Sequence, residues 1–228
     1  MNSNTKKIIG GVVVLGVGAA GFAAYMLRPL PPPTQTTNLN PISFTSQNSD
    51  TKVYRINGEK STAEFDIQEV LRGEDFLVVG TTNNIQGDIS LHTKNPKDSE
   101  LSTIRVNART LKTDNPSRNA AIGRAILKSD QDPYEYIEFK PTGFEGMPES
   151  ITAGVPFSFK IKGDLSISGT VKPVVFDVTV TQNENTLSGT GETTVQYKDF
   201  GLTIPNVPFV ASVQNNVKLK INFVADQV

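Results

Sequence analysis

The sequence predicts an all-β protein: an antiparallel β-barrel of about eight strands with one short helix, preceded by an N-terminal transmembrane helix. Three observations support this prediction. Apolar and polar residues alternate over much of the chain beyond residue 52, as in antiparallel strands with one buried face. One Ala-rich stretch has helical spacing, and one uncharged segment lies near the N-terminus. We therefore divide the chain into residues 1–28, 29–51 and 52–228.

Residues 8–27 contain no charged side chain. Twenty helical residues span about 30 Å, the hydrocarbon thickness of a bilayer. Lys6 and Lys7 precede the run, and Arg28 follows it. Because more basic residues stand before the run than after it, the positive-inside rule places the N-terminus in the cytoplasm and the rest of the chain on the other side of the membrane. We expect a single-pass membrane anchor with an extracytoplasmic C-terminal domain, periplasmic or extracellular. A cleaved signal peptide is the alternative, although its apolar core is usually shorter.

Residues 29–51 begin with a proline cluster and continue with Thr, Asn, Gln and Ser. Consecutive prolines favour an extended polyproline segment, and the polar remainder has too few apolar residues to form a core. We expect a spacer that holds the globular domain away from the membrane. A Pro-rich ligand for a recognition module is the alternative.

The segments with period-two alternation share an apolar phase and a polar phase. The segment after Gly163 contains two of them, with a turn expected near Gly169, Lys172 and Pro173. The expected strands cover residues 62–68, 76–79, 85–92, 104–109, 136–140, 155–162, 165–167, 174–180, 190–197 and 217–223. Turn signals separate several of them, at Asn57-Gly58, Asn95 to Asp98 and Asn183 to Asn185.

One stretch interrupts the β pattern. Residues 119–128 are Ala-rich, with apolar residues at helical spacing. Asn115-Pro116 or Ser117 is a suitable start, and Ser129-Asp130 an end. We expect one short helix across the end or side of the barrel.

The segment from Gly163 to Val174, GDLSISGTVKPV, resembles the signature of the YceI-like family. Further similar segments are YRIN at residues 54–57, TLKTDNPSRN at 110–119, LKS at 127–129, YEYIEF at 134–139 and DFG at 199–201. The resemblance implies a secreted or periplasmic lipocalin-like barrel that holds an isoprenoid or similar long-chain lipid.

The chain departs from the family pattern at polar positions. Glu69-Val70 stands where the family commonly has a histidine, and Asp130 to Pro133 replaces paired aromatic residues. Tyr197-Lys198 precedes the late Asp-Phe-Gly where an arginine is often found. The fold implied by the resemblance is unaffected, but the identity of a bound head group is left open.

The sequence offers little for catalysis or nucleic-acid binding. The chain has 228 residues with 23 acidic and 22 basic side chains, and this balance gives no electrostatic case for nucleic-acid binding. Cysteine is absent, which excludes disulfides and thiolate sites. The only histidine, His92, lies on a polar phase beside a turn, so we expect a structural role. Asp130, Asp132 and Glu135 suggest calcium only weakly, because Pro133 replaces the expected glycine turn. We expect no enzyme and no metal.

A barrel of about eight strands either fills its interior with side chains or holds one ligand. The candidate lining residues for a bound isoprenoid or quinone lipid are Phe65, Ile67, Phe76, Val78, Ile104, Val106, Phe139, Phe157, Phe159, Leu165, Ile167, Phe176 and Val178. Alternation alone does not separate a hollow barrel from a filled one. The leading hypothesis is a membrane-anchored extracytoplasmic lipid carrier, and the alternative is a non-catalytic subunit of a membrane complex.

Overall fold

The computed structural model describes residues 25, 28–34, 44, 50–205 and 210–228. Most of the expected membrane-spanning segment, residues 8–27, lies outside them. No helix formed by the described residues has both the length and the apolar character needed to cross a bilayer. The position of the anchor therefore stays a prediction.

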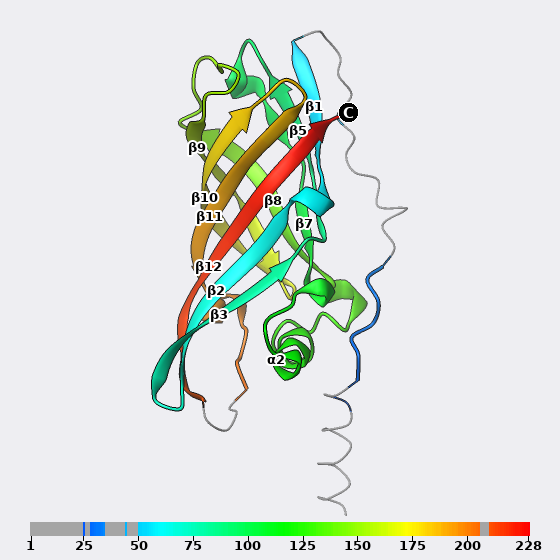
Figure 1. The fold of residues 1–228 in the computed structure, drawn as a ribbon, viewed down its shortest axis with the longest axis vertical. Helices are drawn as coiled ribbons and strands as arrows, with labels where there is room; N and C mark the ends of the chain where they lie inside the picture. Colours follow the sequence, from blue (N-terminus) through cyan, green and yellow to red (C-terminus); the bar gives the residue numbers. More distant parts are fainter. Residues whose placement is uncertain (1–24, 26–27, 35–43, 45–49, 206–209) are drawn as a thin grey trace, which may run out of the picture.

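The described residues form one antiparallel sheet of twelve strands, more than the eight or so that the sequence indicates (Figure 1). The additional strands are short pairing segments and a first strand before the Asn57-Gly58 turn. Their bounds are β1 Thr51–Ile56, β2 Thr62–Leu71, β3 Glu74–Thr82, β4 Ile85–Gln86, β5 Asp88–His92, β6 Glu100–Leu101, β7 Ile104–Asn107, β8 Tyr136–Glu145, β9 Phe157–Ile167, β10 Thr170–Gln182, β11 Thr186–Gln196 and β12 Val210–Gln227.

The sheet curls into a barrel because the long strand β12 pairs with three neighbours. It pairs with β11 along its length, with β2 through its first part and with β1 at its end. Only Gly87 separates β4 from β5, so one chain segment pairs with β7 through β4 and with β1 through β5. The wall is incomplete beside β3: among the described residues, its second edge pairs only through the bridge from Thr81 to Lys112.

Strands β9 and β10 form the hairpin that carries the family-like segment. Ser168 and Gly169 both have positive φ, as a two-residue hairpin turn requires, and β10 starts at Thr170. The predicted turn is therefore confirmed at Gly169, but Lys172 and Pro173 lie inside β10, where Pro173 pairs with Asp164. Tight closure keeps the register in which Leu165, Ile167, Phe176 and Val178 are buried.

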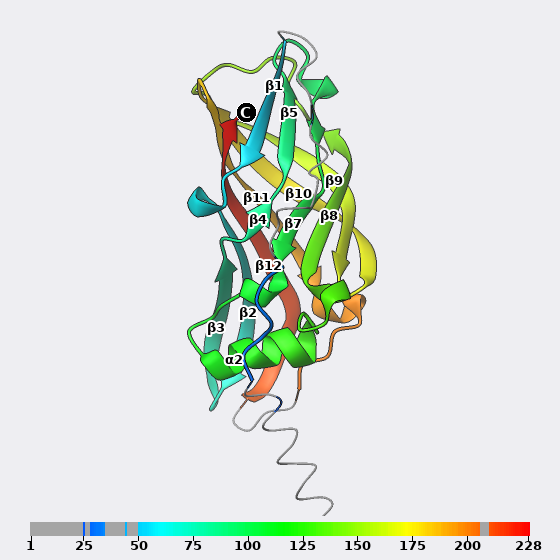
Figure 2. The same cartoon turned by 90° about the vertical axis from the view of Figure 1, so that its right-hand side faces the viewer.

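The predicted helix is confirmed. Helix α2, Pro116–Ala121, continues as a π-helical turn over Ile122–Ile126. The Asn115 side chain caps it by accepting hydrogen bonds from the backbone amides of Ser117 and Arg118. The helix crosses one end of the barrel, next to the open side of β3 (Figure 2). Short 3₁₀ turns occupy Gly58–Lys60, Pro96–Asp98, Ala108–Thr110, Asp132–Tyr134 and Tyr197–Phe200.

Substitutions at two glycines of β11, Gly189 and Gly191, test how closely β10 and β11 pack. A Cβ at Gly189 would lie 2.2 Å from the Thr179 carbonyl oxygen of β10, whereas a Cβ at Gly191 would meet Val178 at an ordinary 3.6 Å. We expect Gly189→Ala to force the two strands apart and lower the free energy of unfolding by about 1–3 kcal/mol. Gly191→Ala is the matched control and should change it by less than about 1 kcal/mol. Urea denaturation measures both, and equal effects would contradict this account of the packing.

Candidate functional site

Three apolar cavities follow one another through the barrel. The largest, which we call the wide chamber, has a volume of about 680 Å³ and lies at the α2 end. A middle cavity of about 80 Å³ and an upper cavity of about 110 Å³ continue from it. Phe65, Leu111, Ile137 and Leu219 line both the wide chamber and the middle cavity. Ile104, Phe139, Phe176 and Ile221 line both the middle and the upper cavity.

Aromatic side chains narrow the path between these cavities. Phe139 and Phe176 meet edge to face, with ring centroids 4.9 Å apart. The Phe65 ring lies over Gly80, its partner residue on β3, where a Cβ would come within 2.1 Å of the ring. Glycine at position 80 therefore leaves room for the ring at the inner end of the wide chamber.

Twelve of the thirteen predicted lining residues do line a cavity. That these residues bind a ligand stays a prediction. The wide chamber includes Phe65, Ile67, Val78 and Ile167; the middle cavity Phe65, Ile104, Val106, Phe139, Leu165 and Phe176; the upper cavity Ile104, Phe139, Phe157, Phe159, Phe176 and Val178.

Phe76 is the exception. It lies near the turn of the β2–β3 hairpin with 36% of its surface exposed, and it lines none of these three cavities. The Arg118 guanidinium lies 5.6 Å from the centre of its ring. The alternation places Phe76 on the apolar, inward-facing side of its strand. It does not indicate that this end of the hairpin lies beyond the enclosed part of the barrel.

Sequence reasoning missed the part of the wide chamber that helical and loop residues form. Ile122, Ile126 and Leu127 close one side of it, and Tyr197 and Leu202 contribute another. The helical spacing of Ile122 and Ile126 was a visible signal for an apolar helix face. Nothing in the sequence indicated that this face covers a cavity rather than a filled core.

Two charged residues of the wide chamber, Glu69 and Arg118, sit at its α2 side; Arg72, in the turn of the β2–β3 hairpin, also lines the chamber. Arg118 lies 3.1 Å from Glu69, and their side chains are 20% and 10% exposed. Asp114 forms a second ion pair with the same guanidinium. Glu69 and Arg118 thus place a carboxylate and hydrogen-bond donors beside a mostly apolar lining, which is the arrangement of a site that orients an amphipathic ligand.

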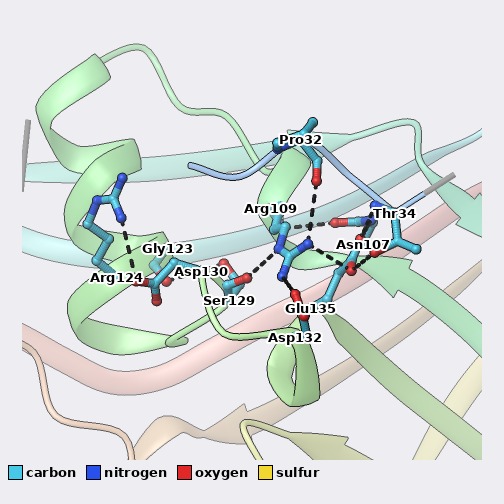
Figure 3. Close-up of polar contacts among 10 residues, drawn as sticks. All are labelled: Pro32, Thr34, Asn107, Arg109, Gly123, Arg124, Ser129, Asp130, Asp132 and Glu135. Carbon is cyan, nitrogen blue, oxygen red and sulfur yellow. Dashed lines mark hydrogen bonds and ion pairs between the residues drawn. The ribbon is translucent and has the colours of Figure 1, made fainter. Parts of the chain in front are cut away.

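A second polar cluster, which the sequence did not indicate, lies outside the chamber, with Arg109 and Glu135 buried and Asp132 exposed (Figure 3). The guanidinium of Arg109 donates to Glu135 at 2.9 Å, to Asp132 at 2.6 Å and to the Ser129 carbonyl oxygen at 2.6 Å. Asn107 donates to the other oxygen of Glu135 at 2.7 Å. Since the side chains of Arg109 and Glu135 are each 3% exposed, mutual pairing compensates the burial of both charges.

The same cluster binds the proline segment. The Thr34 amide donates to Glu135 at 2.7 Å, and the Thr34 hydroxyl donates to the same carboxylate. Burial raises the pKa of Glu135, but the bonds from Thr34 and Asn107 and the charge of Arg109 outweigh it and lower the pKa below its ordinary value. The carboxylate therefore stays ionised and ties residue 34 to the barrel.

Residues 28–34 consequently do not form the free spacer that the sequence predicted. Arg124 donates to the carbonyl oxygens of Arg28 at 2.5 Å and Pro29 at 2.7 Å. The Leu30 side chain lies over Gly123, where a Cβ would come within 2.5 Å of it. We call residues 28–34 the docked segment. The proline-rich composition predicted an extended chain, but not the buried arginines that bind its carbonyl groups.

The weaker sequence signals have structural roles. The Nδ1 atom of His92 accepts a hydrogen bond from the Asn95 amide at 2.9 Å, which stabilises the turn after β5. Asp130 pairs with Arg124, while Asp132 and Glu135 pair with Arg109. These carboxylates are already engaged by arginines, and the described part of the chain contains no group of three metal-ligating side chains.

Comparison with known proteins agrees with this geometry. The sequence profile of the YceI-like domain matches residues 54–225. The chain belongs to the YceI-like family. A comparison with curated proteins gives no match.

Similar solved structures share the fold of this YceI-like chain. A polyisoprenoid-binding domain from Saccharophagus degradans, described as implicated in plant cell wall breakdown, superposes with a TM-score of 0.61 at 10% identity, covering 77% of this chain and 98% of that one. BcnA from Burkholderia cenocepacia gives 0.58 at 16% identity, covering 74% and 98%. A YceI protein from Campylobacter jejuni gives 0.54 at 15% identity, covering 65% and 84%.

The buried cluster generates a prediction about stability. Replacing Glu135 with Gln leaves Arg109 buried with one charge partner fewer, so we expect the free energy of unfolding to fall by about 3 kcal/mol. The pKa of Glu135 is lower in the folded protein than its ordinary value of 4.5, so below about pH 4.5 the unfolded state binds more protons than the folded state. The contribution of Glu135 is therefore complete above that pH and is lost as the pH falls through the native pKa.

Urea denaturation at a series of pH values checks this. The wild-type protein should lose stability on acidification more steeply than Glu135→Gln. Glu145→Gln is the control, because Glu145 forms an exposed pair with Lys162. Parallel curves for wild type and Glu135→Gln would contradict the assigned role of the carboxylate.

Proposed function

We propose that this protein binds and carries a long-chain lipid, such as an isoprenoid or a quinone with an isoprenoid tail, without catalysis. The observation that carries the proposal is the wide chamber of about 680 Å³ with its mostly apolar lining. Ligand pockets of small molecules have about 300–1,000 Å³. The similarity to a domain described as polyisoprenoid-binding supports the same ligand class.

The path beyond the chamber suits the tail of such a lipid. The middle and upper cavities are narrow and lined almost entirely by apolar side chains. Each buried CH₂ group contributes about 0.8 kcal/mol, so a tail that extends past Phe65 gains affinity with its length. The charged pair Glu69–Arg118 stays at the chamber, where it meets the polar end of the ligand.

The proposal includes the membrane location. We infer that residues 8–27 anchor the protein by a single span and that the YceI-like domain is extracytoplasmic. The uncharged run and the lysines before it support this topology. An anchored carrier remains close to the bilayer that supplies its hydrophobic cargo.

A cavity-filling variant tests the chamber as the binding site. Ala121 lines the wide chamber, whereas its neighbour Ala120 on the same helix does not. We expect Ala121→Trp to occupy the space with an indole ring and abolish lipid retention. Ala120→Trp is the matched control and should keep the lipid. The measurement is lipid extraction and mass spectrometry of the full-length protein purified in mild detergent.

Two results would contradict the proposal. One is lipid-free wild-type protein that also fails to take up added isoprenoid alcohol or quinone. The other is equal lipid retention by Ala121→Trp and Ala120→Trp, provided that urea denaturation shows both to be folded. Stable partner proteins in the lipid-free wild-type sample would favour a subunit of a membrane complex.

A second variant tests recognition of the polar end. Arg118→Met keeps an unbranched, flexible side chain, although a shorter one, and removes the charge and the donors at the chamber. Hydrogen bonds to charged groups contribute about 1.5–3 kcal/mol, so binding of an isoprenoid alcohol or quinone should weaken at least about tenfold. Binding of a hydrocarbon of the same length without a head group should change little.

Titration of the purified protein with each ligand measures this difference. Lys162→Met is the control, because Lys162 forms an exposed pair on the outer face of the barrel. Equal weakening for both ligands would show that Arg118 affects the chamber as a whole and does not read the head group.

A further inference from the structure

The docked segment determines which end of the barrel lies at the membrane. Arg28 immediately follows the uncharged run of residues 8–27, and its carbonyl oxygen is already bound by Arg124. The Tyr25 ring, inside that run, lies 4.9 Å from the Arg124 guanidinium. No free linker therefore separates the end of the run from the barrel.

The contacts of this segment lie at the wide chamber. Gly123 and Arg124, which bind Leu30, Arg28 and Pro29, belong to the π-helical turn after α2. Ile122 and Ile126 of the same turn line the chamber. Figures 1 and 2 show the docked segment running along this helical end of the barrel. At the opposite end β1 begins and β5 ends.

The same end carries an exposed apolar surface on β3. Leu77 is 46% exposed and Val79 38%, and both point to the same face of β3; Phe76, on the opposite face, is exposed to a similar extent. These residues lie in the part of β3 that, among the described residues, has β2 as its sheet neighbour and no ladder on the other edge. The β2–β3 hairpin extends past α2 at this end (Figure 1).

We infer that the α2 end of the barrel rests on the bilayer surface, with the exposed side chains of β3 in the interfacial region and the wide chamber next to the lipid. The occupant of the apolar surface is the membrane into which residues 8–27 lead. This inference rests on the proposed carrier function, because the orientation lets a lipid pass between the bilayer and the chamber without crossing water. The pair Glu69–Arg118 then lies on the membrane side, and the tail points away from it.

Site-specific labelling tests this orientation, because the chain has no cysteine of its own. Leu77→Cys and Val155→Cys each receive an environment-sensitive fluorophore in the full-length protein. Val155 is the matched control, since it is 52% exposed and lies in the loop between β8 and β9 at the opposite end. The proteins are reconstituted into phosphatidylcholine vesicles that contain a nitroxide-labelled lipid as quencher.

We expect quenching at Leu77 to exceed quenching at Val155 by at least twofold. A flexible Gly/Ser insertion of about 20 residues between Arg28 and Pro29, with an end-to-end distance of about 25 Å, should remove that difference. Equal quenching of the two labels in the protein without the insertion would overturn the inference. If quenching at Leu77 still exceeds quenching at Val155 after the insertion, the docked segment does not set the orientation of the barrel.

Lipid analysis of the same samples separates the two proposals. Retained lipid with equal quenching would overturn the orientation and leave the carrier function standing. Preferential quenching at Leu77 in protein that never binds isoprenoid alcohol or quinone would support the orientation and contradict the carrier function.

Discussion

The constraint on which this structure depends is the apolar inner phase of nearly every long strand. A sheet with one apolar face must bury that face, and curling into a barrel does so without a second layer. The interior must then be occupied. In the middle of the barrel the rings of Phe139 and Phe176 meet over β9 and leave little space. At the α2 end the side chains leave the wide chamber.

An apolar chamber of this size is unfavourable when empty, because its lining loses contacts in proportion to the volume. Water gains few hydrogen bonds there, since buried waters need about three polar partners. A long-chain lipid satisfies the same surface without a polar partner for each atom. The lining of the wide chamber therefore favours an apolar occupant over water, and the pair of Glu69 and Arg118 adds charged groups at one side of it.

Much of the fold was readable from the sequence because burial imposes period two on each strand. The phases of β2, β7, β9 and β10 were predicted, as was the helix that Asn115 caps. The β9–β10 turn forms at Gly169 as predicted, but the prediction that it also includes Pro173 is wrong. Pro173 is tolerated inside β10, where its ring replaces an N–H but does not break the pairing with Asp164.

Contacts distant in sequence were not readable. Arg109, Glu135 and Thr34 have no common local pattern, and their cluster exists only once the barrel brings residues 107–109 and 132–135 together. For the same reason the proline-rich composition predicts a free spacer and not the docked segment. Alternation identified residues that face inward, but the choice between a filled core and a chamber depends on how side chains of different strands meet. Phe76 shows the limit of such a pattern, because it lies near the turn of a hairpin that extends beyond the enclosed part of the barrel.

A high-resolution experimental structure of the full-length protein, purified with the lipid it acquires in the cell, tests the central claim most directly. This account predicts elongated density that begins beside Glu69 and Arg118, passes Phe65 and extends towards the middle cavity. A wide chamber that contains only ordered water, or that closes by repacking of its own side chains, would contradict it.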